Sequence, residues 1–113
     1  MGLLDGRRAV VTGSSRGIGR AYAKALAAAG AKVVVNGTTK ELVLQVVDEI
    51  RAAGGTAVPC VESISTFEGA ERLIKSCADH YGGIDILVNN AGVVAERMMF
   101  YMTEQEFKGP MMV

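Results

Sequence analysis

The sequence predicts an α/β fold, namely a doubly wound parallel sheet of about four strands with flanking helices. Short apolar runs alternate along the 113 residues with stretches whose apolar residues recur at helical spacing. The links between these stretches are short and rich in glycine. Strands that alternate with helices in this way pair in parallel through right-handed crossovers, with helices on both faces of the sheet.

Two apolar runs and a glycine predict the first strand, helix and strand. Residues 8–12 form the first run, and residues 31–36 form the second, whose consecutive valines are typical of a strand covered on both faces. Residues 18–30 are mostly small and predict the helix between them. Gly30 is the expected C-terminal stop of that helix.

The second helix is predicted from a capping box followed by a helical repeat. Thr38 and Glu41 have the capping-box spacing, and two glycines at 54 and 55 close the helix. Residues 56–61 predict a third strand, although Pro59 removes one donor from the ladder. The apolar positions of the helix are Val43, Val46, Val47 and Ile50.

The last predicted elements are a third helix, a fourth strand and the start of a fourth helix. Ser65 and Glu68 have the spacing of a second capping box, and residues 84–89 form the fourth strand. Thr103 and Glu106 begin a further helix, which Gly109-Pro110 interrupts within two turns. The apolar face of the third helix consists of Ala70, Leu73, Ile74, Cys77, Ala78 and Tyr81.

The turn after the first strand predicts an anion site. Glycines at 13, 17 and 19 let the backbone turn tightly and approach a ligand, and the following helix offers N–H groups and the positive end of its dipole. All charged residues from Gly6 to Lys40 are basic, and the first helical turn carries Arg16 and Arg20 where acids usually stand. We therefore expect a dinucleotide here, while a solvated basic face is the alternative for the outer lysines.

The glycine spacing separates this loop from two common nucleotide motifs. A Walker loop would need glycine and lysine where Ile18 and Gly19 stand, and the GxGxxG spacing also fails because the glycines give GxxxGxG. The loop after the fourth strand reads Asn89-Asn90-Ala91-Gly92. Together these two motifs closely resemble the short-chain dehydrogenase/reductase family, including its 3-oxoacyl-carrier-protein reductase-like members, from about residue 6 to about residue 107.

The resemblance implies a partial Rossmann fold in which residues 1–113 are the N-terminal, dinucleotide-binding half and the catalytic half is absent. It also implies three groups of cofactor-binding residues. The first loop supplies Gly13, Ser14, Ser15, Arg16, Gly17, Ile18 and Gly19, the turn after the second strand supplies Asn36, Gly37, Thr38 and Thr39, and the loop after the fourth strand supplies Asn90, Ala91 and Gly92. Alternatively, the two asparagines only bond their own turn.

The residues after the second strand predict the choice of cofactor. Members of the family that bind NAD carry an acid roughly 20 residues beyond the glycines, where it takes the ribose hydroxyls and repels a 2′-phosphate. This chain has Asn36-Gly37-Thr38-Thr39 there and no carboxylate. With Arg16 nearby, we expect NADP(H) rather than NAD(H). Ser63 stands where the family usually has an aspartate that contacts adenine, which puts that contact in question.

No catalytic residue of the family has a counterpart in this chain. The resemblance implies hydride transfer between NADP(H) and a carbonyl or alcohol substrate, with a YxxxK pair and a serine that this chain lacks. Tyr22 and Tyr81 lie inside the first and third predicted helices, and Tyr101 is followed four residues later by Gln105 and not by a lysine, so all three are expected to be packing residues. The chain is thus expected to be inactive alone. Three hypotheses about the chain stay open. The first is the cofactor-binding portion of a reductase that acts on 3-oxoacyl thioesters, ketosteroids or similar carbonyls. The second is a catalytically inactive dinucleotide-binding or regulatory fragment, and the third is a decayed product without function.

Composition excludes several other classes. The 12 basic and 12 acidic residues balance, so a nucleic-acid surface is not expected, and no apolar run suggests a membrane segment or secretory signal. A cytoplasmic location is the default. Cys60 and Cys77 are expected to be buried free thiols, and with His80 as the sole histidine no metal site is expected. The methionines near the end of the chain favour self-association, as does the sheet edge beside them.

Overall fold

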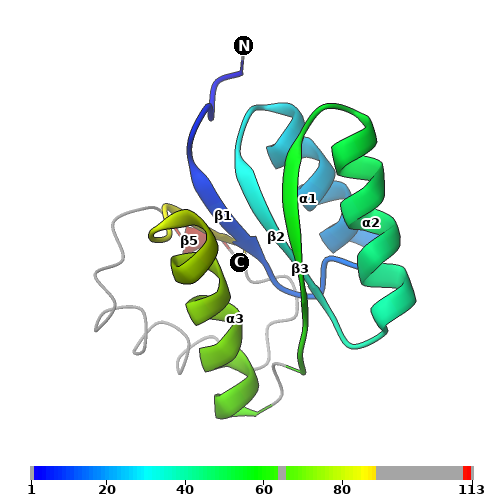
Figure 1. The fold of residues 1–113 in the computed structure, drawn as a ribbon, viewed down its shortest axis with the longest axis vertical. Coiled ribbons are helices and arrows are strands. Elements are labelled where there is room, and N and C mark those ends of the chain that lie inside the picture. The colour runs from blue at the N-terminus through cyan, green and yellow to red at the C-terminus, as the bar shows by residue number, and fades with distance from the viewer. Residues whose placement is uncertain (1, 64–65, 89–110, 113) are drawn as a thin grey trace.

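A five-stranded parallel sheet forms the centre of the molecule. The computed structural model describes residues 2–63, 66–88 and 111–112. Its strands follow the order β3-β2-β1-β4-β5, and every pairing in the sheet is parallel (Figure 1). The order reverses beside β1, which confirms the doubly wound α/β fold. The strands are β1 (Arg8–Val11), β2 (Lys32–Gly37), β3 (Thr56–Val61), β4 (Ile86–Val88) and β5 (Met111–Met112).

Three helices cover the two faces of this sheet. Helices α1 (Gly17–Ala28) and α2 (Lys40–Ala52) lie on one face, and α3 (Phe67–Tyr81) lies on the other (Figure 1). The bounds agree with the predicted helices to within a few residues. Because strand side chains alternate between faces, Val11 and Val35 join the core beneath α1 and α2, while Val10 and Val34 join the core beneath α3.

Two helix starts differ from the predicted capping boxes. The N-cap of α2 is Thr39, one residue after the predicted Thr38, and its side chain forms no capping hydrogen bond. The N-cap of α3 is Thr66, whose hydroxyl accepts a hydrogen bond from the Gly69 N–H at 3.0 Å. Adjacent hydroxyl residues make the box spacing ambiguous by one position, so the pattern located both helices but not their caps. The predicted cap Ser65 lies outside the described residues.

The carboxylate of Asp85 ties the start of β4 to β1. It accepts hydrogen bonds from the Arg8 side chain at 2.8 and 3.0 Å and from the Arg8 backbone N–H at 2.9 Å. These bonds hold the pKa of Asp85 below its ordinary value and raise the pKa of Arg8. Strand β4 begins directly after Asp85, at Ile86 and not at the predicted residue 84.

The remaining elements of the prediction have mixed outcomes. Two-residue β5 was not predicted, and the expected helix at 103–106 lies outside the described residues. Cys77 is a buried free thiol as expected, whereas Cys60 is free but only half-buried. Tyr81, the last residue of α3, packs against the core beneath that helix and donates a hydrogen bond to the Val33 carbonyl at 3.1 Å. Tyr22 is 44% exposed on the outer side of α1, so its predicted packing role is wrong.

Candidate functional site

The predicted anion site lies where β1 ends and α1 begins. Gly13 and Gly17 have φ values of 59° and 60°, in the left-handed region that glycine adopts without strain. A Cβ atom at Gly17 would meet nothing within 4 Å, so glycine is required there by the backbone and the space beside it is open. The loop thus turns twice within five residues and presents its backbone at the carboxyl edge of the sheet.

The N-terminus of α1 has the chemistry of an anion site. Its N-cap is Arg16 in extended conformation, no side chain caps the helix, and its first turn contains no acid. The first N–H groups of a helix have no partner within the helix, and the dipole adds partial positive charge there. Arg16 and Ile18 are both exposed beside this helix end, and Gly19 is buried. The end of the helix is therefore suited to bind a phosphate or pyrophosphate group.

Arg20 of the first helical turn forms an ion pair within the protein. Its guanidinium binds the Glu49 carboxylate of α2 through Nε at 3.1 Å and through a second, shorter contact from Nη2. The Lys24 amine lies 3.8 Å from the same carboxylate. Hydrogen bonds from Arg20 are the main cause of the lowered pKa of Glu49. Within the described part of the chain, Arg16 is the cation of this helix end that forms no ion pair.

Ser14 joins the glycine loop to β2 inside the protein. The residue has no exposed surface. Its hydroxyl donates to the Val11 carbonyl at 2.7 Å and accepts from the Asn36 N–H at 2.8 Å, while its own N–H donates to the Asn36 carbonyl at 2.7 Å. The Ser14 side chain was expected to line the cofactor, but these bonds use it to hold the loop.

The Asn36 side chain is a second internal connection and not an exposed ligand. The residue is 1% exposed. Its Oδ1 accepts the Gly13 N–H at 3.0 Å, and its Nδ2 donates to the carbonyls of Cys60 and Glu62 at 3.2 and 3.0 Å. One carboxamide thereby connects the glycine loop, β2 and the end of β3. A polar residue directly after three buried valines was the sequence signal for this role.

The turn after β2 brings three further predicted residues to the same edge. Gly37 is buried against Ser15, Thr38 is exposed, and Thr39 is partly buried at the start of α2. Ser15 is 8% exposed, and its hydroxyl forms no hydrogen bond within the described residues. A buried hydroxyl without a hydrogen-bond partner is rare in proteins unless a ligand or a water molecule supplies that partner. Because Gly37 packs against Ser15, the first loop and the turn after β2 are adjacent, as expected.

The third predicted group lies outside the described residues. Asn90, Ala91 and Gly92 follow β4, which pairs with β1 so that Val88 lies opposite Val11. The Thr12 N–H donates to the Val88 carbonyl at 3.0 Å. The chain therefore leaves β4 next to the start of the glycine loop. Glu62, at the end of β3, forms an ion pair with Arg72 of α3 at 2.9 Å.

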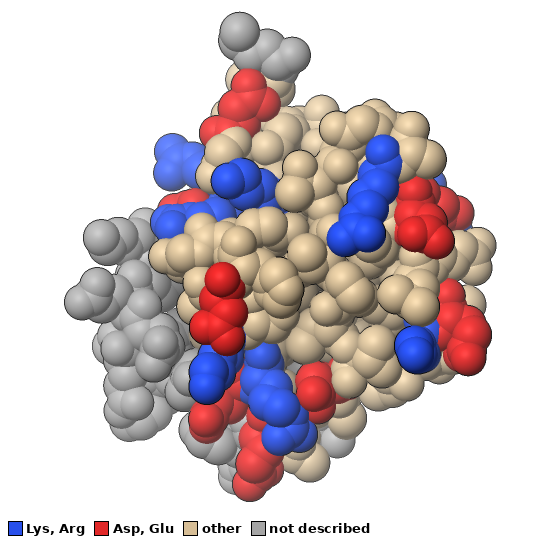
Figure 2. All heavy atoms as spheres, viewed as in Figure 1, with Lys and Arg blue, Asp and Glu red and all other residues tan. Residues whose placement is uncertain are grey.

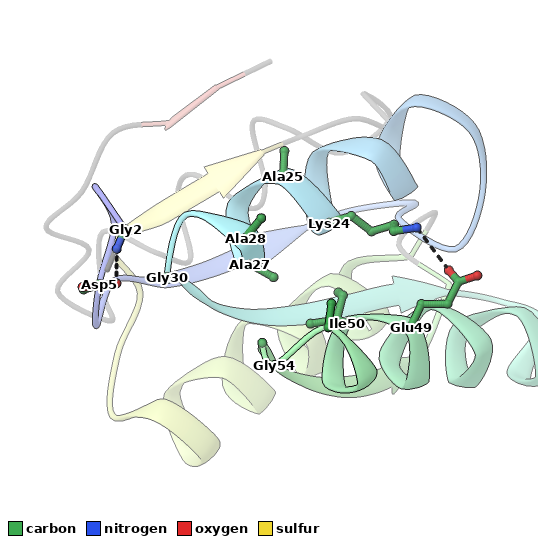
Figure 3. Close-up of a pocket in the computed structure, with 12 residues that line it drawn as sticks. Gly2, Asp5, Lys24, Ala25, Ala27, Ala28, Gly30, Glu49, Ile50 and Gly54 are labelled. Atoms are coloured by element: carbon green, nitrogen blue, oxygen red, sulfur yellow. Dashed lines mark hydrogen bonds and ion pairs between the residues drawn. The ribbon is translucent and has the colours of Figure 1, made fainter.

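A cavity of about 550 Å³ lies between α1 and α2, away from this site (Figure 3). Its lining includes Gly30 and Gly54, which follow the C-terminal ends of the two helices and so lie at the amino edge of the sheet. Lys24 and Glu49 reach toward one another at its rim (Figure 3). Topology thus separates this cavity from the carboxyl edge, where α/β sheets bind their ligands.

Charge and composition elsewhere add little to the site. On the face shown in Figure 2, acidic and basic side chains are interspersed around uncharged surface. Residues 2–63, 66–88 and 111–112 contain no group of three or more side chains that could hold a metal ion. Among the same residues, no helix is long and apolar enough to cross a membrane.

Comparisons with known proteins agree with this geometry. A family model described as short chain dehydrogenase matches residues 7–113. A hydroxyacyl-CoA dehydrogenase of Mycobacterium tuberculosis is 46% identical over 109 residues, which are 92% of this chain and 34% of that protein. The chain thus spans about a third of the length of this relative.

Two solved structures of similar dehydrogenases contain bound dinucleotides. A short chain dehydrogenase from Burkholderia cenocepacia in complex with NADP is 43% identical with a TM-score of 0.74, over 80% of this chain and 37% of that one. A 7α-hydroxysteroid dehydrogenase complexed with NADH and 7-oxo glycochenodeoxycholic acid is 40% identical with a TM-score of 0.74, over 76% of this chain and 34% of that one. The chain belongs to the short chain dehydrogenase family of oxidoreductases.

Proposed function

We propose that this chain binds NADP(H) and is the cofactor-binding half of an oxidoreductase that transfers hydride between NADP(H) and a carbonyl or alcohol substrate. The observation that carries the proposal is the uncapped, acid-free N-terminus of α1, placed beside a β2 turn that has no carboxylate. The pyrophosphate would lie on the first N–H groups of α1, between Gly13 and Gly19. Bound NADP(H) would supply the hydride-carrying nicotinamide.

The residues at this edge fit the phosphates of NADP(H). The hydroxyl of Ser15 is buried without a hydrogen-bond partner in the described residues, so an oxygen of the ligand would supply the missing hydrogen bond. Arg16, Thr38 and Thr39 would contact the 2′-phosphate, because they are the cation and hydroxyls at the two neighbouring chain turns. Ser14 and Asn36 would hold the loop from inside. Contacts of Asn90, Ala91 and Gly92 with the adenosine side stay a prediction.

The preference for NADP(H) over NAD(H) rests on charge. A carboxylate after β2 would repel a 2′-phosphate, and residues 36–39 contain none. Arg16 would add a favourable interaction with the phosphate dianion. The family itself leaves the choice open, since one solved relative holds NADP and another holds NADH.

Turnover would require residues that this chain does not contain. The positions four residues after its three tyrosines hold Leu26, Asp85 and Gln105, so no YxxxK pair is present. We therefore propose that residues 1–113 are an N-terminal dinucleotide-binding half, inactive alone, and that a longer protein would supply the acid/base tyrosine. The names of the hydroxyacyl-CoA and hydroxysteroid relatives support 3-oxoacyl thioesters or ketosteroids as substrates. A catalytically inactive dinucleotide-binding or regulatory fragment is the second candidate.

Fluorescence titrations with NADPH and NADH test the cofactor proposal. The chain should bind NADPH more tightly than NADH, and Arg16→Glu should weaken NADPH by about tenfold or more, equivalent to about 1.4 kcal/mol. Lys32→Glu is the matched control, because this exposed lysine stands at the opposite edge of the sheet. Equal affinity for both dinucleotides would contradict the preference. An Arg16→Glu variant that binds NADPH as well as the control would contradict the proposed site.

Two further expectations have separate tests. A carbonyl-reductase assay on the chain alone should show no turnover, and measurable turnover would contradict the proposed division into halves. Size-exclusion chromatography with light scattering should show self-association, whereas a sharp monomer peak would contradict it. The cytoplasmic location stays a prediction.

A further inference from the structure

We propose that Arg51 and Pro59 close the outer edge of β3, so that a second copy of this chain does not extend the sheet there. Strand β3 stands at one end of the strand order, and among the described strands it pairs only with β2 (Figure 1). The outer side of an end strand normally presents free N–H and C=O groups, which can pair with an extended segment of another chain. Two features of this edge oppose such pairing.

The composition of β3 makes this edge one that needs protection. Thr56–Val61 reads Thr-Ala-Val-Pro-Cys-Val, with no charged residue among the six. Uncharged segments of this length that favour the extended conformation associate readily through their backbones, provided that they lack proline. Val61, at the end of the strand, leaves 40% of its surface exposed. Apart from Pro59, the strand therefore has the composition of a segment that pairs with copies of itself.

Strand geometry decides which backbone groups of β3 point outward. Successive residues of a strand in a parallel sheet direct their N–H and C=O groups alternately to its two sides. The Glu62 N–H donates to the Gly37 carbonyl at 3.1 Å, and the Cys60 carbonyl accepts a hydrogen bond from the Asn36 side chain at 3.2 Å. Residues 60 and 62 therefore face β2. Residues 57, 59 and 61 consequently face the outer edge.

Two of these three outward positions are closed. Pro59 has no N–H, so the middle of the edge lacks the donor that a pairing strand requires. The Ala57 carbonyl accepts a hydrogen bond from Arg51 Nε at 3.0 Å. Arg51 belongs to the last turn of α2, and this bond lays its charged side chain against the outer side of β3. A docking strand would have to displace that side chain and would still miss one bond at Pro59.

The closed edge restricts the surfaces through which the chain self-associates. Contacts between copies should form elsewhere and leave the outer side of β3 exposed to water. The Val61 N–H is the useful probe, because it lies on the outward side and Val61 is an exposed residue. In wild type its exchange with deuterated water should be independent of protein concentration. An exchange rate that falls as the concentration rises would overturn the proposal, and this measurement needs no substitution.

Two substitutions at position 51 separate the hydrogen bond from the charge. Glutamine places its Nε2 where arginine has Nε, so Arg51→Gln keeps a donor for the Ala57 carbonyl and loses the charge, whereas Arg51→Met loses both. Each would be combined with Pro59→Val, which restores the missing N–H. Size-exclusion chromatography with light scattering over a concentration series measures association, and circular dichroism verifies that each variant is folded.

The variant that carries Arg51→Met and Pro59→Val should associate at a concentration on the order of tenfold or more below that of wild type, because each copy gains two backbone groups for pairing. Its Val61 amide should exchange more slowly as the concentration rises. The matched variant with Arg51→Gln should associate distinctly less than the one with Arg51→Met. Equal association of the two would overturn the role of the Arg51 bond. A folded Arg51→Met and Pro59→Val variant that associates no more than wild type would overturn the proposal as a whole.

Discussion

Replacing Asn36 with alanine should destabilise the chain by about 2–4 kcal/mol. The carboxamide makes three hydrogen bonds, at 3.0 Å to the Gly13 N–H and at 3.2 and 3.0 Å to the carbonyls of Cys60 and Glu62. Each such bond contributes about 0.5–1.5 kcal/mol, and groups left buried without partners add to the cost. Since Asn36 is 1% exposed, water does not replace these bonds without local opening.

Urea unfolding followed by far-ultraviolet circular dichroism measures this loss, because the chain has no tryptophan for fluorescence. With a slope of about 1.5 kcal/mol per molar urea, the midpoint should fall by about 2 M. Asn36→Asp should be at least as destabilising, since it cannot donate to the two carbonyls and buries a charge. Thr38→Ala is the exposed control and should leave the midpoint in place. A loss below about 0.5 kcal/mol for Asn36→Ala would refute the role of Asn36 as an internal connection.

Three further results are expected. Thr66→Ala should cost about 1 kcal/mol of stability, because it removes the hydroxyl that caps α3. Thr39→Ala should show no such cost, because the Thr39 side chain forms no capping hydrogen bond. Equal effects of the two changes in the same unfolding assay would contradict the cap assignment. The lowered pKa of Asp85 means that its ion pair stabilises the fold above the ordinary carboxyl pKa and is lost as the pH falls through the lowered value. The urea midpoint of wild type should therefore fall more steeply than that of Asp85→Asn between about pH 5 and pH 2, and parallel slopes would argue against the pair. Burial raises the pKa of Cys60 to about 11 and of Cys77 to about 12, so neither native thiol should react readily with iodoacetamide at pH 8, and rapid alkylation would disprove this.

Local patterns in the sequence predicted most of the fold. The three valines before Asn36 gave a strand covered on both faces, and the small residues up to Gly30 gave a helix with its stop. Both signals depend only on residues that are neighbours in the sequence, so they can be recognised without knowledge of the tertiary structure. The two-residue β5 lacks such a signal, because its parallel pairing with β4 defines it.

The sequence predicted that the candidate residues lie at one edge of the sheet, but it did not give the contacts that each of them makes. Ser14 lies in the glycine loop and Asn36 in β2, and their hydrogen bonds connect this loop, β2 and the end of β3, which the sequence could not show because it does not give the strand register. The partner of Arg20, Glu49, lies 29 residues away on another helix, so the sequence did not reveal that Arg20 forms an internal ion pair. Interactions between distant segments thus decided which polar residues face a ligand and which hold the loop.

A titration of the isotope-labelled chain with NADPH, followed by amide chemical shifts, tests the central claim most directly. Shifts should concentrate on Ser15 to Gly19 and on Gly37 to Thr39, the two turns at the carboxyl edge of the sheet. The amides of Gly30 and Gly54, beside the cavity at the opposite edge, should not move. No shifts at saturating NADPH, or shifts centred on that cavity, would contradict the account.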